Sequence, residues 1–261
     1  MLDIPTKFDQ NSIDFIKRIN AKAVLNSERM PISHVYGSMS GLYSARETTR
    51  LGDLFRQDFI NHLDELEKIN VDFFYALNAS CLGSLDTKEL LKLRKVIEDI
   101  KNMGVKNFIV AHPLMLDLVR SIIPKAKIKA SVILEIDDFK RFRFFMDKAD
   151  IINISTKVNR NFTFLKSLSK YKEKVEFLCN EVCIYMCPYR DSHYTIESHR
   201  YKKEENYPNE YPVDLCYEMM TNIELLRARF ILPEWIKYYK QLHTDSYLWV
   251  VRFKGFSRAA N

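Results

Sequence analysis

The sequence predicts an α/β fold of the (βα)8, TIM-like barrel type. Short apolar runs typical of strands alternate with longer segments of helical period along the whole chain. Eight strand candidates are enough to close a barrel, and 261 residues are close to the usual length of such a domain. An open, doubly wound sheet is the competing fold. Neither a GxGxxG after the first strand nor a GxxxxGK[ST] anywhere in the chain supports it.

The elements follow one another in a regular order. Strands are predicted at residues 2–5, 33–37, 71–77, 107–111, 128–134, 150–155, 175–179 and 246–253, and helices at 12–19, 51–69, 87–103, 114–123, 137–147, 161–169 and 233–241. Local signals agree: residues 86–89 resemble a capping box, Gly104 follows a helix, and Pro233 suits a first helical position. Only residues 254–261 follow the last strand, so the last helix of the barrel is expected to be missing.

Residues 1–261 are predicted to form one domain, with a cysteine-containing insertion at 183–227 after the seventh strand. No apolar run is long enough to span a membrane, and the first residues lack a signal-peptide pattern, so we expect a cytoplasmic protein without a membrane partner. In a reducing compartment, five cysteines favour metal or redox chemistry over disulfides. The net charge of +6 is mild. It fits solvated edges of strands and helices, or a field that attracts an anionic substrate or RNA.

Polar residues follow the ends of several predicted strands. The carboxyl ends of parallel barrel strands meet at one mouth, where active sites of this fold lie. The candidates for catalysis are Asn78, His112, Glu135 and Arg160, and those for substrate binding include Arg46 and Asn159. Plain structural roles are open as well, since His112 precedes a proline and Glu135 precedes a helix. As a set, these amide, guanidinium and carboxylate groups would suit a polar or anionic ligand.

Three of the five cysteines, Cys179, Cys183 and Cys187, lie within nine residues. An iron–sulfur cluster is the first interpretation, with Cys183, Cys187 and Cys216 as its core and Cys179 or Cys81 as the fourth ligand. Cys179 lies on a predicted strand, where a buried thiol acting as a small apolar group is equally plausible.

Two other chemistries compete for the same segment. A zinc site formed by Cys183, Cys187, His193 and His199 has the right ligand types, but its spacing is shorter than in common zinc fingers. A radical SAM cluster would require CxxxCxxC, whereas the chain has CxxxCxxxC.

The run at residues 180–193, continuing to His199, resembles the NxxCxxxCPxRxxH signature of the peptidase U32 family. Further blocks at 35–38, 77–83, 159–162 and 229–235 resemble the family's segments in the same order. The resemblance implies a (βα)8 barrel and a [4Fe–4S] cluster. Cys183 and Cys187 match the motif and Cys216 matches a later cysteine, while Arg190 and His193 lie within the signature as candidates for substrate binding. Relatives of this short type often have a further cysteine soon after that position, but residues 217–222 contain none. The fourth ligand is therefore open.

The resemblance also carries expectations about function. Better-understood relatives act in oxygen-independent hydroxylation of ubiquinone precursors or RNA bases, and others are described as collagenase-like proteases. We therefore expect an enzyme that modifies a small anionic or aromatic substrate at the barrel mouth. The alternatives are a peptidase, although neither HExxH nor GxSxG occurs, and a non-catalytic, cluster-bearing subunit paired with a paralogous protein. No RNA-recognition module supports an RNA partner.

Overall fold

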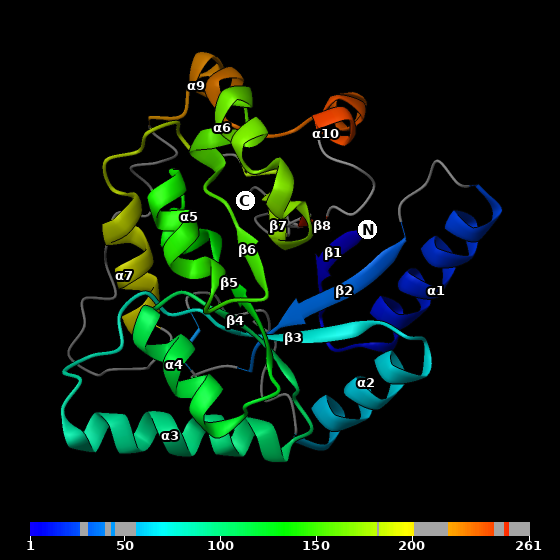
Figure 1. Cartoon of the computed structure of the whole chain (residues 1–261). Coiled ribbons are helices and arrows are strands. Elements are labelled where there is room, and N and C mark those ends of the chain that lie inside the picture. Colours follow the sequence, from blue (N-terminus) through cyan, green and yellow to red (C-terminus); the bar gives the residue numbers. More distant parts are fainter. Residues whose placement is uncertain are drawn as a thin grey trace, which may run out of the picture.

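The computed structural model describes residues 1–26, 31–39, 43–44, 56–181, 183–200, 219–242 and 248–250. In this part of the chain, parallel strands surround a central axis and alternate with helices (Figure 1). The strands are β1 (Leu2–Pro5), β2 (Ile32–Gly37), β3 (Asp72–Leu77), β4 (Asn107–Val110), β5 (Lys127–Ala130), β6 (Ile151–Asn153), β7 (Val175–Leu178) and β8 (Leu248–Val250). Each strand pairs with the next in the chain, and β8 pairs with both β7 and β1, which closes the ring. The predicted α/β fold of alternating strands and helices is confirmed.

The helices lie on the outside of the strands and at the mouth of the barrel (Figure 1). They are α1 (Gln10–Leu25), α2 (Arg56–Lys68), α3 (Thr87–Asn102), α4 (Pro113–Ile122), α5 (Phe139–Met146), α6 (Phe162–Ser167), α7 (Arg190–Arg200), α9 (Asn222–Arg227) and α10 (Ile236–Leu242). Short 3-10 helices are η1 (Val132–Leu134), η2 (Thr156–Val158), η3 (Ser169–Lys174) and η4 (Pro233–Trp235). The last helix, which is expected to be missing, would follow β8 in a part of the chain outside the described ranges. Residues 201–218 of the predicted insertion also lie outside those ranges.

Most of the apolar core lies between the strands and the helices. Alternate residues of a strand face opposite sides, so Phe108 and Val110 of β4 join this layer, whereas Ile109 faces the barrel interior with Phe74 of β3. Phe108 is fully buried, and burying a side chain of this size contributes about 1.5–3 kcal/mol. The strands thus carry an apolar outer face and a mixed inner face, and only the outer face is explained by core packing.

Side-chain caps fix where several helices begin. Asp9 accepts a hydrogen bond from the backbone N–H of Ser12 at 2.8 Å, and Asp86 accepts one from Glu89 at 2.8 Å. Such caps satisfy backbone donors that the first turn leaves unpaired, at about 1 kcal/mol each. The cap at Asp9 places the start of α1 two residues before the predicted helix.

Two differences from the sequence prediction lie near the mouth of the barrel. The fifth strand ends at Ala130, because the Ser131 side chain caps η1 by accepting from the N–H of Ile133. The segment after Cys187 forms the helix α7, whereas the sequence predicts only an insertion there.

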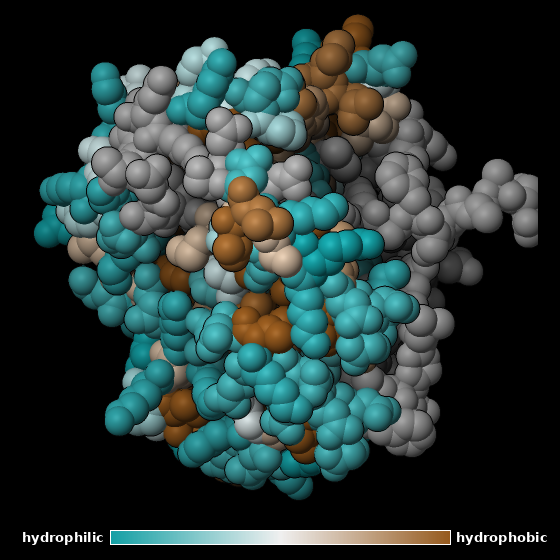
Figure 2. Space-filling model, turned by 90° about the vertical axis from the view of Figure 1, so that its right-hand side faces the viewer, coloured by the Kyte–Doolittle hydropathy of each residue, from teal (hydrophilic) through white to brown (hydrophobic). Residues whose placement is uncertain are grey.

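The face in Figure 2 is mostly hydrophilic, with hydrophobic side chains in small separate patches. Among the described residues, no helix combines the length and the apolar content needed to cross a membrane.

Candidate functional site

Helix α7 lies against the carboxyl ends of the strands. Tyr194 packs against a small apolar cluster formed where β4, β5 and β7 end, which consists of Ala111, Val132, Ile133 and Leu178. Further along the helix, the Ser198 hydroxyl oxygen accepts a hydrogen bond of 2.9 Å from the backbone N–H of Ser80, which follows β3. The helix therefore spans the mouth of the barrel, the face on which enzymes of this fold build their active sites. Its two ends meet different loops of that mouth.

Arg190, the first residue of α7, is buried at the mouth between two carboxylates. Its Nε donates to Oε1 of Glu135 at 2.5 Å, and its Nη2 lies 3.6 Å from Oε2 of Glu181. Glu135 also accepts from the Ser155 hydroxyl at 2.8 Å and pairs with Lys157 at 2.9 Å. Burial alone would raise the pKa of Glu135, but Arg190, Lys157 and Ser155 outweigh burial and hold it below its usual range. Glu135 is thus an ionised anchor for both cations.

A hollow beside Arg190 contains further cationic and thiol groups. Its lining includes Lys157, Cys183, Tyr185 and Arg229. The Nη2 of Arg190 and the Nε of Arg229 are buried without a hydrogen-bond partner among the described residues. The Arg229 guanidinium lies 4.0 Å from the centre of the Tyr185 ring, which holds it in place. A buried N–H without a hydrogen bond costs about 1–3 kcal/mol, so an anionic oxygen that reaches these nitrogens would be stabilised. The enclosed part of the hollow, about 10 Å³, has room for about one such atom.

Cys183 and Cys187 lie on the turn that leads into α7, and both are half-buried. The N–H of Cys187 donates to the carbonyl of Ile184 at 3.2 Å, and the N–H of Arg190 donates to the carbonyl of Cys187 at 3.3 Å. Iron–sulfur clusters are held by cysteine side chains, and runs of closely spaced cysteines are typical of their sites. The two thiols therefore fit the first half of a metal–thiolate site. Within the described ranges, no group of three metal-ligating side chains includes either of them, and the predicted ligand Cys216 lies outside those ranges.

Cys179 is placed differently from the other thiols. It is buried in the apolar layer outside the strands, with its Sγ 3.7 Å from the carbonyl of Phe177. Burial, with a smaller contribution from Glu176, raises the pKa of this thiol far above its usual range. Because Cys179 packs in the apolar layer outside the strands and does not line the hollow that contains Cys183, its position disfavours it as a fourth ligand.

The other end of α7 carries a second thiol. Cys81 follows β3 and is half-buried, and its Sγ lies 3.1 Å from Nε2 of His199. Asn78, on the same loop, accepts a hydrogen bond of 3.3 Å from the Ser44 hydroxyl. His199 is nine positions after Arg190, which corresponds to about 13 Å along the helix axis. The pair of Cys81 and His199 is thus separated from the turn with Cys183 by most of the length of α7.

Several predicted site residues hold the backbone together. The His112 Nδ1 accepts from the backbone N–H two residues later, at 3.2 Å, and caps α4; burial lowers the pKa of this imidazole. The Asn159 amide donates to the carbonyl groups of Leu178 and Arg229 at 3.0 and 2.7 Å. Arg160 donates to the carbonyl at 228 at 3.0 Å. These contacts provide structural roles for residues that the sequence analysis had proposed for catalysis or substrate binding.

The remaining candidates lie apart from this cluster or cannot be placed. His193 is half-buried on α7, stacks on Tyr194 and lies 4.0 Å from Glu197. Arg46 lies outside the described residues. Of the predicted rim residues, the structure therefore brings Glu135, Arg190 and Cys183 together, and it places Asn78 near the opposite end of α7.

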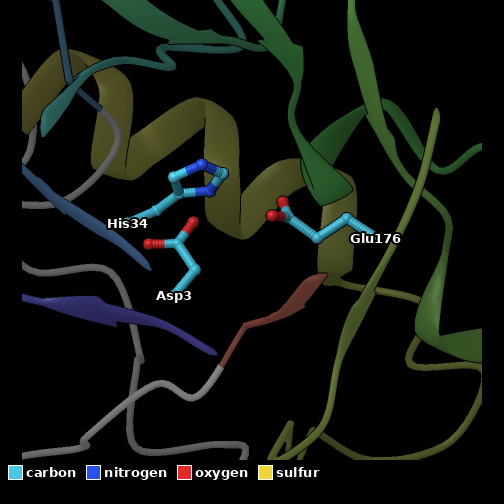
Figure 3. Close-up of side chains that lie close together, drawn as sticks. All are labelled: Asp3, His34 and Glu176. Atoms are coloured by element: carbon cyan, nitrogen blue, oxygen red, sulfur yellow. The ribbon is translucent and has the colours of Figure 1, made fainter. Parts of the chain in front are cut away.

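A polar cluster in the barrel interior was not anticipated from the sequence. Asp3, His34 and Glu176 come from β1, β2 and β7, and their side chains turn toward one another inside the barrel (Figure 3). Lys129 of β5 lies among them, with its Nζ 2.5 Å from Asp3, 2.7 Å from Glu176 and 3.2 Å from Nδ1 of His34. Asn153 donates a further hydrogen bond to Glu176. The interior of this barrel is thus partly ionic, where branched apolar side chains usually dominate.

The interior cluster has an internal cation. The three side chains that could ligate a metal ion lie around the ammonium group of Lys129, which already contacts all of them. Burial opposes the charge on Lys129, but Asp3 and Glu176 outweigh it and raise its pKa. Burial lowers the pKa of His34 to about 2, helped by Lys129, so this imidazole is neutral. One ammonium faces two carboxyl groups, and burial raises the pKa of Asp3 to about 7. Asp3 Oδ1 has no hydrogen-bond partner among the described residues.

The strands and helices form a barrel with a charged cluster at its mouth, and comparison with known proteins gives its family. Residues 22–175 match the model of peptidase family U32, and the chain belongs to this family. The matched segment ends before Cys183, so the cysteine motif lies beyond it.

Two similar proteins agree with this assignment. The chain is 27% identical over 240 residues to the uncharacterized protease MJ1657 of Methanocaldococcus jannaschii, covering 89% of this chain and 69% of that protein. It resembles the structure of the U32 peptidase Mk0906 with a TM-score of 0.66 at 12% identity, covering 100% of this chain and 93% of the other. At this identity, the second likeness supports the fold alone.

Proposed function

We propose that this U32 family member is an enzyme that binds a small anionic substrate in the hollow at the barrel mouth, beside a [4Fe–4S] cluster. Cys183, Cys187 and Cys216 are the proposed cluster ligands, and oxygen-independent hydroxylation is the proposed class of reaction. The observation that carries the proposal is the buried Nη2 of Arg190, which has an ion pair with Glu181 at 3.6 Å but no hydrogen bond among the described residues, in a hollow that Cys183 also lines.

The charges of the hollow support an anionic substrate. Arg190 is held by Glu135, so its position is fixed before a ligand arrives. Lys157 and Arg229 line the same hollow, so that with Arg190 three cationic side chains face the single carboxylate of Glu181. Planar guanidinium groups bind carboxylate or phosphate with two hydrogen bonds. The cluster, when bound, would supply electron transfer or Lewis-acid activation next to the substrate. The side chains of the hollow would orient the anion and neutralise its charge.

Metal analysis tests the cluster. In protein isolated without oxygen, we expect iron and sulfide in equal amounts, with loss of both in Cys183→Ser, Cys187→Ser and Cys216→Ser. Loss of iron and sulfide in Cys81→Ser or in Cys179→Ser would identify the fourth ligand. The structure favours neither of these two thiols. Stoichiometric zinc with no iron after reconstitution would contradict the cluster.

Anion binding is tested separately in cluster-free protein. Malonate, a small dicarboxylate, should raise the melting temperature of the native chain and have a smaller effect on Arg229→Met. Arg227→Met is the matched control, because Arg227 pairs with Glu224 on the exposed face of α9 and does not line the hollow. Equal malonate effects in both variants would overturn the proposed site.

Peptide hydrolysis is the second candidate. Both similar proteins are named as proteases or peptidases. A hydrolase that works through a covalent intermediate requires a nucleophile next to a base, and the contact between Cys81 and His199 provides these residue types.

A further inference from the structure

We propose that Cys81 is a nucleophilic thiol with His199 as its base, forming a reactive site for acyl compounds that is distinct from the hollow beside Cys183. The 3.1 Å contact between Cys81 Sγ and His199 Nε2 allows direct proton transfer from thiol to imidazole. This site deepens the second candidate function, peptide hydrolysis, and does not require a cluster.

Hydrogen bonds join the loop that carries Cys81 to helix α7. The N–H of Ser80 donates to the Ser198 hydroxyl oxygen at 2.9 Å, and the two serine hydroxyls lie 3.2 Å apart. The Ser198 hydroxyl in turn donates to the carbonyl of Tyr194 at 2.7 Å. These bonds join the β3 loop to the same helix that carries His199. A nucleophile and a base that are fixed to each other in this way need little reorganisation before reaction.

Accessibility distinguishes Cys81 from the buried thiol. Cys81 is half-buried and lies at the carboxyl end of a strand, whereas Cys179 faces the apolar layer outside the barrel. A substrate entering the mouth could therefore reach Cys81. The distance of about 13 Å between the two ends of α7 argues against Cys81 joining a cluster at Cys183 and Cys187.

The proposed step is acyl transfer. The Cys81 thiol gives its proton to Nε2 of His199, and the sulfur forms a bond to the acyl carbon of an ester, thioester or amide. The bond to the leaving group breaks, and the leaving group takes the proton from His199. Water then attacks the thioester with His199 accepting its proton, and the carboxylic acid leaves as the thiol is restored.

Alkylation with iodoacetamide tests the pair directly. In cluster-free protein at pH 7, peptide mapping should show that His199→Gln slows alkylation of Cys81 by about tenfold or more. Thr195→Ser, a change to another half-buried residue of α7, should leave this rate unchanged. Added imidazole should restore part of the rate in His199→Ala, which a purely structural role of His199 would not predict. An unchanged rate in His199→Gln would overturn the pair.

Two further measurements separate the alternatives. If Cys81 reacts only after a chelator is added, or if Cys81→Ser loses iron, it is a metal ligand and the proposal is wrong. With p-nitrophenyl acetate, one acyl group per chain should appear on Cys81 and be absent in Cys81→Ser; fast alkylation without acylation would overturn the substrate class. Failure of peptide cleavage together with acylation of Cys81 would count against the second candidate function and support the acyl site.

Discussion

The ammonium nitrogen of Lys129 lies 2.5 Å from Oδ2 of Asp3, across the barrel interior between β5 and β1. Both side chains are fully buried, and Glu176 completes the contact from β7 at 2.7 Å. A buried cation between two carboxyl groups links strands that are not neighbours in the barrel. It therefore ties the stability of the whole barrel to one side chain.

Replacing Lys129 with methionine should destabilise the protein strongly. The substitution leaves two buried carboxyl groups without their cation, and breaking such a buried pair costs about 3–5 kcal/mol. Lys127→Met is the control: Lys127 lies on the same strand, is partly exposed, and lies 3.6 Å from the half-exposed Asp72. Such a pair contributes below about 1 kcal/mol. Urea unfolding measures both changes. Equal losses of unfolding free energy in the two variants would show that the interior cluster contributes no more than the exposed pair.

Asp3→Asn should change how stability depends on pH. Burial raises the pKa of Asp3 to about 7 in the folded state, against about 3.9 in an unfolded chain. Between these values the folded state binds more protons, so the contribution of Asp3 to stability falls as pH rises from about 4 to about 7. The free energy of unfolding of the native chain, minus that of Asp3→Asn, should fall over this range. A flat or rising difference would contradict the prediction.

The sequence predicted the order of the strands and helices but not the interior cluster. Short apolar runs such as residues 107–111 predict strands by themselves, because a strand that is buried on both faces needs apolar side chains on both. The meeting of Asp3, His34 and Lys129 depends on register: Asp3 pairs with His34 between β1 and β2, and Lys129 reaches them from the opposite side. Charged residues at inward positions of several strands are a usable signal, but only once the barrel is known.

The sequence predicted only part of the site at the mouth, because the rest depends on how the chain folds over the strands. Glu135, Arg190 and Cys183 were selected, and the structure places them around one hollow. Helix α7 was missed, because its sequence has few apolar residues and its position depends on contacts with the mouth. The pairing of Cys81 with His199 follows from that helix, so it could not be derived without it.

Glu135→Gln should show the opposite pH dependence to Asp3→Asn. Arg190, Lys157 and Ser155 hold the pKa of Glu135 below its usual range despite its burial. The contribution of Glu135 to stability is therefore present above the pKa of an unfolded glutamate, about 4.3, and is lost as pH falls through the lower folded pKa. The difference in unfolding free energy between the native chain and Glu135→Gln should shrink below about pH 4.3. Acid titrations of both proteins in urea check this, and a constant difference would contradict it.

Cys179 should be the least reactive thiol among the described residues. Its side chain is packed outside the strands, and burial raises its pKa far above the usual range. The thiolate is the reactive form, so alkylation should require unfolding of the barrel, whereas Cys183 and Cys187 should react in the folded, cluster-free protein. Mass spectrometry of iodoacetamide adducts against time and urea concentration measures each site. Cys179→Ala should also leave the iron content unchanged, because Cys179 packs in the apolar layer outside the strands and does not line the hollow that contains Cys183. Rapid alkylation of Cys179 without urea, or a loss of iron in Cys179→Ala, would restore it as the fourth ligand.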